Sequence, residues 1–165
     1  MRNTVIKHLF AALALACAMA VPAAAQTSLG ANVTFLSEEG DDTGAGFEVD
    51  LSGRISPELA VVGEFGLNDF EFSTITSYLG GVRYLPAVEA SVNPFVHVLL
   101  GLERFTSEGF DASNGFAFQL GGGVEFPVSD SLAVRAQYDY RRTSYDGEGF
   151  NGNRFGVGVV FPLGR

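Results

Sequence analysis

Several residue types that commonly carry chemistry are scarce in this chain. Its 165 residues include one cysteine, Cys17, and two histidines, His8 and His97. Cys17 lies in an N-terminal segment that we expect to be removed, so the remaining chain would have no disulfide, no thiol nucleophile and no zinc–thiolate site. Lysine occurs once, at Lys7, so every basic residue after that position is arginine. Beyond residue 25, no apolar run approaches the ~20 residues that a membrane-spanning helix needs.

The beginning of the chain has the pattern of a secretory signal peptide. A basic start precedes the apolar run Leu9–Val21, and an A-x-A site ends at Ala25. The run has 13 residues and is too short for a membrane anchor. Lipidation of Cys17 is an alternative, but the residues before it fit a lipoprotein signal less well than the downstream site fits cleavage. We predict a signal peptide over residues 1–25 and one domain over residues 26–165.

Acidic residues outnumber basic residues by a wide margin. The full chain has ten Lys and Arg against 19 Asp and Glu, a net charge of −9. Without the two basic residues of the signal peptide, eight remain against the same 19, and the net charge becomes −11. Such a chain repels phosphate, which excludes nucleic acid as a partner. The 21 glycines and 15 phenylalanines instead suit many strands joined by tight turns.

Segments of about ten residues with alternating apolar and polar side chains recur through residues 26–165. The period of two and the many glycines argue against helices. Short turns alternate with longer acidic, glycine-rich connections, which predicts an antiparallel up-and-down arrangement. We expect eight strands, over residues 28–37, 44–55, 58–68, 73–85, 93–105, 114–126, 131–145 and 153–165.

Most segments have one bulky apolar face and one face that combines charged or polar residues with glycine. A soluble lipocalin-like barrel would turn the apolar face inward, whereas a membrane barrel turns it toward lipid. Glycine favours the membrane barrel, because the narrow interior of an eight-stranded barrel needs small residues beside large ones. Interior charges must then be paired, and arginine can bridge several carboxylates. We predict a polar lumen network of Glu48, Asp50, Arg54, Glu64, Arg83, His97, Glu103, Glu125, Arg135, Asp139 and Arg141.

Aromatic residues on the apolar faces fall near both ends of the segments, and two aromatic girdles are typical of membrane barrels. A barrel in lipid must also close, because an open edge would leave backbone groups unpaired, so we expect the first and last segments to pair. The predicted loop-side girdle contains Phe35, Phe47, Phe116, Tyr140 and Phe155, and the turn-side girdle contains Tyr84, Phe126 and Phe161.

The stretch Arg154-x-Gly156-x-x-Val159-x-Phe161 resembles the C-terminal signal that the barrel-assembly machinery of bacterial outer membranes reads. That signal is a polar residue, a glycine and two hydrophobic residues at the end of the last strand; here Pro162–Arg165 follow it. The stretches SYLGGVRYL and SLAVRAQYDYRRT also resemble strands of small OmpA/OmpX-like barrels, which we group broadly with the porin family. The resemblance implies an all-β, eight-stranded antiparallel transmembrane barrel in the bacterial outer membrane. It also implies export through the periplasm and periplasmic termini.

We expect a structural or surface-interaction protein rather than an enzyme, a monomer without cofactors whose partners are outer-membrane lipids and the barrel-assembly machinery. One alternative is a lipid A-modifying enzyme, but His97 lies mid-strand, in a segment of ambiguous frame, with no serine nearby in that segment. A soluble lipocalin-like barrel and a channel are the others, although paired charges would plug so narrow a lumen. Acidic loops suit divalent cations, and a solvated acidic surface explains them as well. The loop acids are Glu38, Glu39, Asp41, Asp42, Asp69, Glu71, Glu108, Asp111, Asp146 and Glu148.

Overall fold

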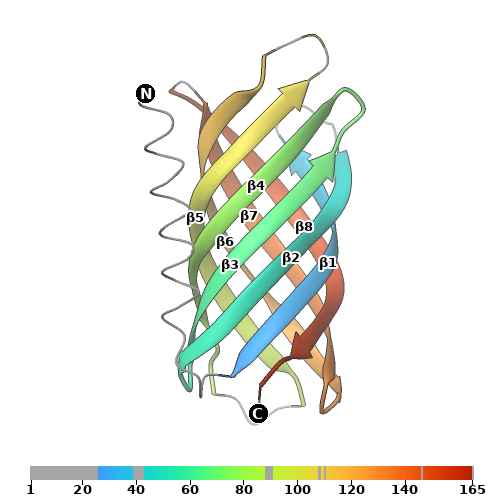
Figure 1. The fold of residues 1–165 in the computed structure, drawn as a ribbon, viewed down its shortest axis with the longest axis vertical. Coiled ribbons are helices and arrows are strands. Elements are labelled where there is room, and N and C mark those ends of the chain that lie inside the picture. The colour runs from blue at the N-terminus through green and yellow to red at the C-terminus, as the bar shows by residue number, and fades with distance from the viewer. Residues whose placement is uncertain are drawn as a thin grey trace.

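Eight antiparallel strands form a closed barrel in the computed structural model, which describes residues 26–38, 43–87, 91–107, 109, 111–145 and 147–164. The strands are β1 (Thr27–Glu38), β2 (Thr43–Ser56), β3 (Leu59–Asp69), β4 (Ser73–Tyr84), β5 (Asn93–Ser107), β6 (Ser113–Ser129), β7 (Leu132–Tyr145) and β8 (Glu148–Pro162). Each strand pairs with its neighbours in sequence, and β1 also pairs with β8 (Figure 1). The prediction of a closed, eight-stranded up-and-down barrel is therefore confirmed. None of the described residues belongs to a helix long and apolar enough to cross a membrane.

The seam between β1 and β8 closes the sheet without leaving an edge. Leu29 lies opposite Phe161, and Phe35 lies opposite Phe155 in this ladder. Because every strand has a partner on both sides, the backbone groups of the wall can pair within the sheet, which a sheet in lipid requires. We call the end where β1 begins and β8 finishes the turn end, and the opposite end the loop end (Figure 1).

The last strand is longer than its sequence pattern predicts. β8 begins at Glu148 rather than at Asn153, because the ladder to β7 continues up to the pair Tyr145–Glu148. Gly147 lies in the connection with a φ of 94°, a conformation that glycine adopts most easily. β6 likewise runs to Ser129, into a stretch where the sequence predicts a turn. Cross-strand pairing thus outweighs the weak strand propensity of these glycine-, asparagine- and proline-containing stretches.

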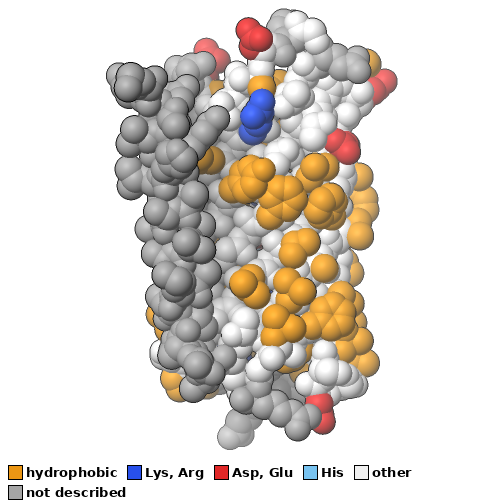
Figure 2. All heavy atoms as spheres, viewed as in Figure 1, with side chains coloured by type: hydrophobic (Ala, Val, Ile, Leu, Met, Phe, Trp, Pro, Cys, Tyr) orange, Lys and Arg blue, Asp and Glu red, His pale blue; other side chains and the backbone are white. Residues whose placement is uncertain are grey.

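The two faces of the sheet have opposite character. Large apolar side chains cover the outside of the wall (Figure 2). Val33 is 57% exposed and Phe155 is 47% exposed, for example. The inward face instead buries Asn, Gln, Asp, Glu and Arg side chains. Such a wall is stable against lipid rather than water, whereas a lipocalin-like barrel requires the opposite placement.

Exposed aromatic side chains lie toward both ends of the wall, at the heights where lipid tails meet headgroups in membrane barrels. All members of both predicted girdles face outward and are exposed. They are Phe35, Phe47, Phe116, Tyr140 and Phe155 toward the loop end, and Tyr84, Phe126 and Phe161 toward the turn end.

Candidate functional site: a charged lumen

Arg154 lies within the lumen and pairs with three carboxylates. It comes from β8 and is fully buried. Its Nη2 lies 2.8 Å from Glu48 Oε2 and 2.8 Å from Asp139 Oδ2, and its Nη1 lies 2.9 Å from Glu64 Oε1. One planar guanidinium can hold three acceptors because its N–H groups point in different directions. The side chain therefore ties β8 to β2, β3 and β7.

Toward the loop end, Arg141 continues the network. Its Nη1 lies 2.9 Å from Glu103 Oε2, and its Nη2 lies 3.7 Å from Glu64 Oε1. The hydroxyl of Tyr145 donates a hydrogen bond to the other Glu103 oxygen, Oε1, at 2.7 Å. Since Arg141 and Glu103 are each 1% exposed, this pair fills the lumen at its loop end.

Toward the turn end, Asp50 is held between two arginines. Arg135 Nη1 forms an ion pair with Asp50 Oδ2, and Arg83 Nη2 lies 3.1 Å from Asp50 Oδ1. Arg135 also binds Glu125 at 2.7 Å. The Phe95 ring centre lies 4.6 Å from the guanidinium carbon of Arg83 and 5.3 Å from that of Arg135, a cation–π arrangement. Both arginines thus have a carboxylate partner and an aromatic neighbour.

Two buried glutamines connect the charged groups, although the charge pattern of the sequence gives no sign of them. Gln119 donates to Glu64 Oε2 at 3.3 Å and accepts from Arg141 Nη2 at 2.9 Å. Gln137 donates to Glu48 Oε2 at 2.8 Å. Both glutamines share the parity of the inward charges, and this parity is the signal by which the sequence could have identified them.

His97 lies in the lumen and is 1% exposed, with its Nε2 2.7 Å from Asp139 Oδ1. The inward face of β5 therefore contains His97, in the frame that leaves Val96 and Val98 toward lipid. Among the described residues, the fully buried charges are five carboxylates and four guanidiniums, namely Glu48, Asp50, Glu64, Glu103 and Asp139, and Arg83, Arg135, Arg141 and Arg154.

Glycines on the inward face leave the room that the carboxylates occupy. Gly121 lies opposite Asp139 in the β6–β7 ladder, and a Cβ at Gly121 would collide with the Asp139 carboxylate. Gly30 lies opposite Asp50 in the β1–β2 ladder, and a Cβ there would collide with that carboxylate. Gly63, on the outward face, has open space instead. Gly30 and Gly121 thus leave space for the buried carboxylates.

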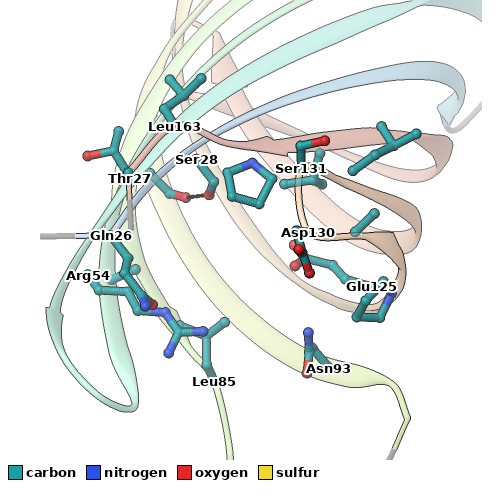
Figure 3. A pocket seen from close by; sticks show the side chains of 18 of the residues that line it. Gln26, Thr27, Ser28, Arg54, Leu85, Asn93, Glu125, Asp130, Ser131 and Leu163 are labelled. Carbon is teal, nitrogen blue, oxygen red and sulfur yellow. Dashed lines mark hydrogen bonds between the residues drawn. The ribbon is translucent and has the colours of Figure 1, made fainter.

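At the turn end the lumen widens into a cavity of about 740 Å³. Figure 3 shows Arg54 on one side of this cavity and Glu125 with Asp130 on the other. Arg54 Nη1 donates to the carbonyl oxygen of Pro57 at 3.0 Å, and no carboxylate of the described residues pairs with it. The structure therefore does not bring Arg54 into the buried network, because its place on β2 is four residues nearer the turn end than Asp50.

The four residues of the predicted assembly signal divide between the two faces of β8. Arg154 and Gly156 point inward and are buried, whereas Val159 and Phe161 face outward, with Phe161 41% exposed. The sequence analysis placed Arg154 only in the assembly signal. In the structure, its side chain also forms ion pairs with three carboxylates, the largest number for any side chain in the described lumen.

Five of the ten acids of the predicted cation-binding loops, Glu39, Asp41, Asp42, Glu108 and Asp146, lie outside the described residues, as does the predicted signal peptide, residues 1–25. Within the described ranges, no group of three or more His, Cys, Asp or Glu side chains is placed to hold a metal ion.

Glu38 is a loop-end acid with a well-defined environment. It is the last residue of β1 and lies three positions past the outward Phe35, beyond the apolar band of the wall. Burial raises the pKa of Glu38 from 4.5 to about 7, and the nearby Glu103 carboxylate raises it further, while Arg141 opposes the rise. Glu38 therefore changes charge near neutral pH.

A closed eight-stranded sheet with an apolar wall, aromatic ends and a filled polar lumen defines a small transmembrane β-barrel. A sequence model of the outer membrane protein β-barrel domain family matches residues 9–161. The chain belongs to this family and is a bacterial outer-membrane protein. No curated protein sequence matches it.

Solved structures with the same fold are small outer-membrane barrels. Neisserial surface protein A superposes with a TM-score of 0.71 at 16% identity, covering 86% of this chain and 98% of that protein. The N-terminal β-barrel domain of Pseudomonas aeruginosa OprF gives 0.57 at 14% identity, covering 83% and 99%. The outer membrane enzyme PagL gives 0.53 at 16% identity, covering 82% and 99%. Identities this low show a shared fold, and PagL shows that the fold is compatible with catalysis.

Proposed function

We propose that this protein is a non-conducting, non-enzymatic outer-membrane barrel that presents acidic loops at the cell surface. The observation that carries the proposal is the buried network around Arg154, which links β8 to β2, β3 and β7 inside the barrel. A lumen filled by paired charges leaves little room for a path for ions, which argues against a channel. The wall and the loops are then the surfaces through which the protein interacts.

We infer that the loop end faces the cell exterior and the turn end faces the periplasm. Longer loops outside and short turns inside are the usual arrangement of outer-membrane barrels. Residues 1–25 would direct export and be cleaved after Ala25, and the motif Arg154–Phe161 would be read by the barrel-assembly machinery. The closed sheet offers no edge for a second chain, which supports a monomer.

A lipid-modifying enzyme is the second candidate, because PagL shares the fold. Catalysis by a Ser–His–acid triad requires a histidine in reach of both nucleophile and substrate. His97 is the one histidine among the described residues, it is 1% exposed, and its Nε2 is engaged by Asp139. A lipid outside the wall has no access to that position, which supports a non-enzymatic role.

The acidic loops are proposed to form a solvated recognition surface, and divalent cations that bridge these loops to lipid phosphates are the other explanation. Removal of Mg²⁺ and Ca²⁺ with EDTA distinguishes the two. A solvated surface predicts unchanged resistance of the loops to protease, whereas bridging cations predict faster cleavage after chelation.

Heat-modifiability tests the proposed membrane barrel, and conductance tests whether the paired charges block its lumen. The mature chain folded in detergent should migrate faster on a gel before boiling than after it. In planar bilayers, the wild type should show at most rare, small openings. The double variant Asp50→Ala/Arg135→Ala removes the ion pair between these residues and their pairs with Arg83 and Glu125, and it should open more often. A chain that stays soluble without detergent, or a wild type with stable open channels, would contradict the proposal.

A further inference from the structure

In the part of the chain that the structure describes, charged side chains are rare on the outer wall and lie at the loop end. Among the strand residues that the structure describes, the outward-facing charged positions are Asp69, Arg104 and Arg142, and all three are exposed. Asp69 accepts a hydrogen bond from Thr74 Oγ1 at 2.7 Å. Neither arginine has a carboxylate partner within the described part of the chain. Two cations without such a partner therefore lie on the wall of a strongly acidic protein.

Arg142 follows two tyrosines that reach across from β7 to β8. Tyr138 OH donates to Asn153 Oδ1 at 2.8 Å, and Tyr140 OH donates to Asn151 Oδ1 at 2.6 Å. Arg142 is the next outward residue of β7 toward the loops. We call these three β7 side chains and the two asparagines the β7–β8 patch.

A glycine leaves the Arg142 guanidinium uncovered above this patch. A Cβ at Gly149 of β8 would lie 3.0 Å from Arg142 Nη2, so the guanidinium extends over Gly149. On the other side, Arg142 lies opposite Phe118 of β6, part of the apolar wall. The cation is therefore placed where an apolar surface ends and a polar surface begins.

We propose that the β7–β8 patch binds the headgroup of a phosphorylated glycolipid of the outer leaflet. Arg142 would hold the phosphate, since the guanidinium fork matches phosphate oxygens in a bidentate geometry. The Tyr–Asn pairs would face the sugar hydroxyls, and the tyrosine rings would lie at the boundary with the acyl chains. The placement in the outer leaflet rests on the orientation given under the proposed function.

Charge explains why the ligand would come from the membrane and not from solution. The mature chain has a net charge of −11, and its loops are acidic, so soluble polyanions are repelled from this end of the barrel. A lipid phosphate is instead held beside the wall by its acyl chains, at the height of the loop-end aromatic residues. Arg142 meets the phosphate there without an approach through the acidic loops.

Native mass spectrometry of the folded full-length mature protein in detergent tests the site, with diphosphoryl lipid A as the probe. The wild type should retain lipid A, and Arg142→Gln should weaken its apparent affinity about tenfold, as expected for loss of a charge-assisted contact. Arg104→Gln is the matched control, because Arg104 is also an exposed, outward, loop-end arginine, and it should change affinity less than about twofold. Dephosphorylated lipid A should bind about tenfold more weakly to the wild type.

Two results would overturn the inference. Equal affinities of the wild type and Arg142→Gln would show that Arg142 does not bind the phosphate. Displacement of lipid A by inorganic phosphate at millimolar concentration would show a site for a free anion. Unchanged heat-modifiability of both variants ensures that a loss of binding is not a loss of fold.

The orientation is tested separately, by labelling Glu71→Cys on intact cells with a membrane-impermeant maleimide. Glu71 lies in the described loop between β3 and β4 and is exposed. Absence of labelling would contradict the proposed orientation and place the patch in the inner leaflet. Labelling combined with no lipid A binding would leave the proposed function intact and overturn the site.

Discussion

Replacement of Arg154 tests whether the lumen network stabilises the barrel. In Arg154→Met, the carboxylates of Glu48, Glu64 and Asp139 lose a guanidinium that lies 2.8 to 2.9 Å away. Removal of one partner from a buried ion pair costs about 3–5 kcal/mol, because the remaining charge is left without compensation. We therefore expect the free energy of unfolding to fall by at least ~3 kcal/mol, which is about two orders of magnitude in the unfolding equilibrium.

Urea titration of the folded protein in detergent micelles, with the folded fraction read from the unboiled gel band, measures this loss. Arg154→Lys keeps the charge but not the planar fork, so it should lose an intermediate amount. Arg54→Met is the control, because Arg54 lies on the same face but donates only to a backbone carbonyl, and it should cost less than ~1 kcal/mol. An Arg154→Met variant no less stable than Arg54→Met would refute the stabilising role of the network.

Three further predictions concern other parts of the barrel. Gly121→Ala should lower stability by about 1–3 kcal/mol in the same titration, because its Cβ would collide with Asp139. Gly63→Ala should be neutral, because the space outside Gly63 is open. Equal effects of the two substitutions would contradict the packing argument. In the unfolded chain Glu38 ionises near pH 4.5, whereas in the folded state it keeps its proton to about pH 7. The free energy of unfolding should therefore fall as pH rises between these values. An unchanged slope of stability against pH in Glu38→Gln would contradict this assignment. In cells, Phe161→Ala should reduce the heat-modifiable fraction in the outer membrane more than the equally lipid-facing Phe155→Ala, and similar reductions would argue against an assembly signal.

The strands and their two faces could be predicted because they depend on a local pattern. Alternation with a period of two decides which side chains share a face, and that relation holds within one strand without reference to any other. The errors fall where the pattern is weak. Residues 148–152 read as a loop because glycine and asparagine disfavour strands, but hydrogen bonds to β7 extend β8 through them.

The partners within the lumen could not be predicted in this way. Asp50 and Arg135 are 85 residues apart in sequence, and Glu48 and Gln137 are 89 apart. Which inward residues reach the same height inside the barrel depends on the stagger of all eight strands, a property of the closed sheet as a whole. The partners of the two buried glutamines and the central position of Arg154 escaped prediction for this reason, and Arg54 was assigned to a network from which its height excludes it.

The sequence by itself therefore determined a closed barrel with a lipid-facing apolar wall and a charged, glycine-containing interior, because these follow from the alternation of side chains along each strand. Only the tertiary structure decided how the charges combine. It brings Arg154 against Glu48, Glu64 and Asp139, leaves Arg54 at a cavity, and exposes Arg142 beside the Tyr–Asn pairs of β7 and β8. The physical reason is that ion pairs form between atoms a few ångströms apart, and the register of the closed sheet decides which charges approach to that distance.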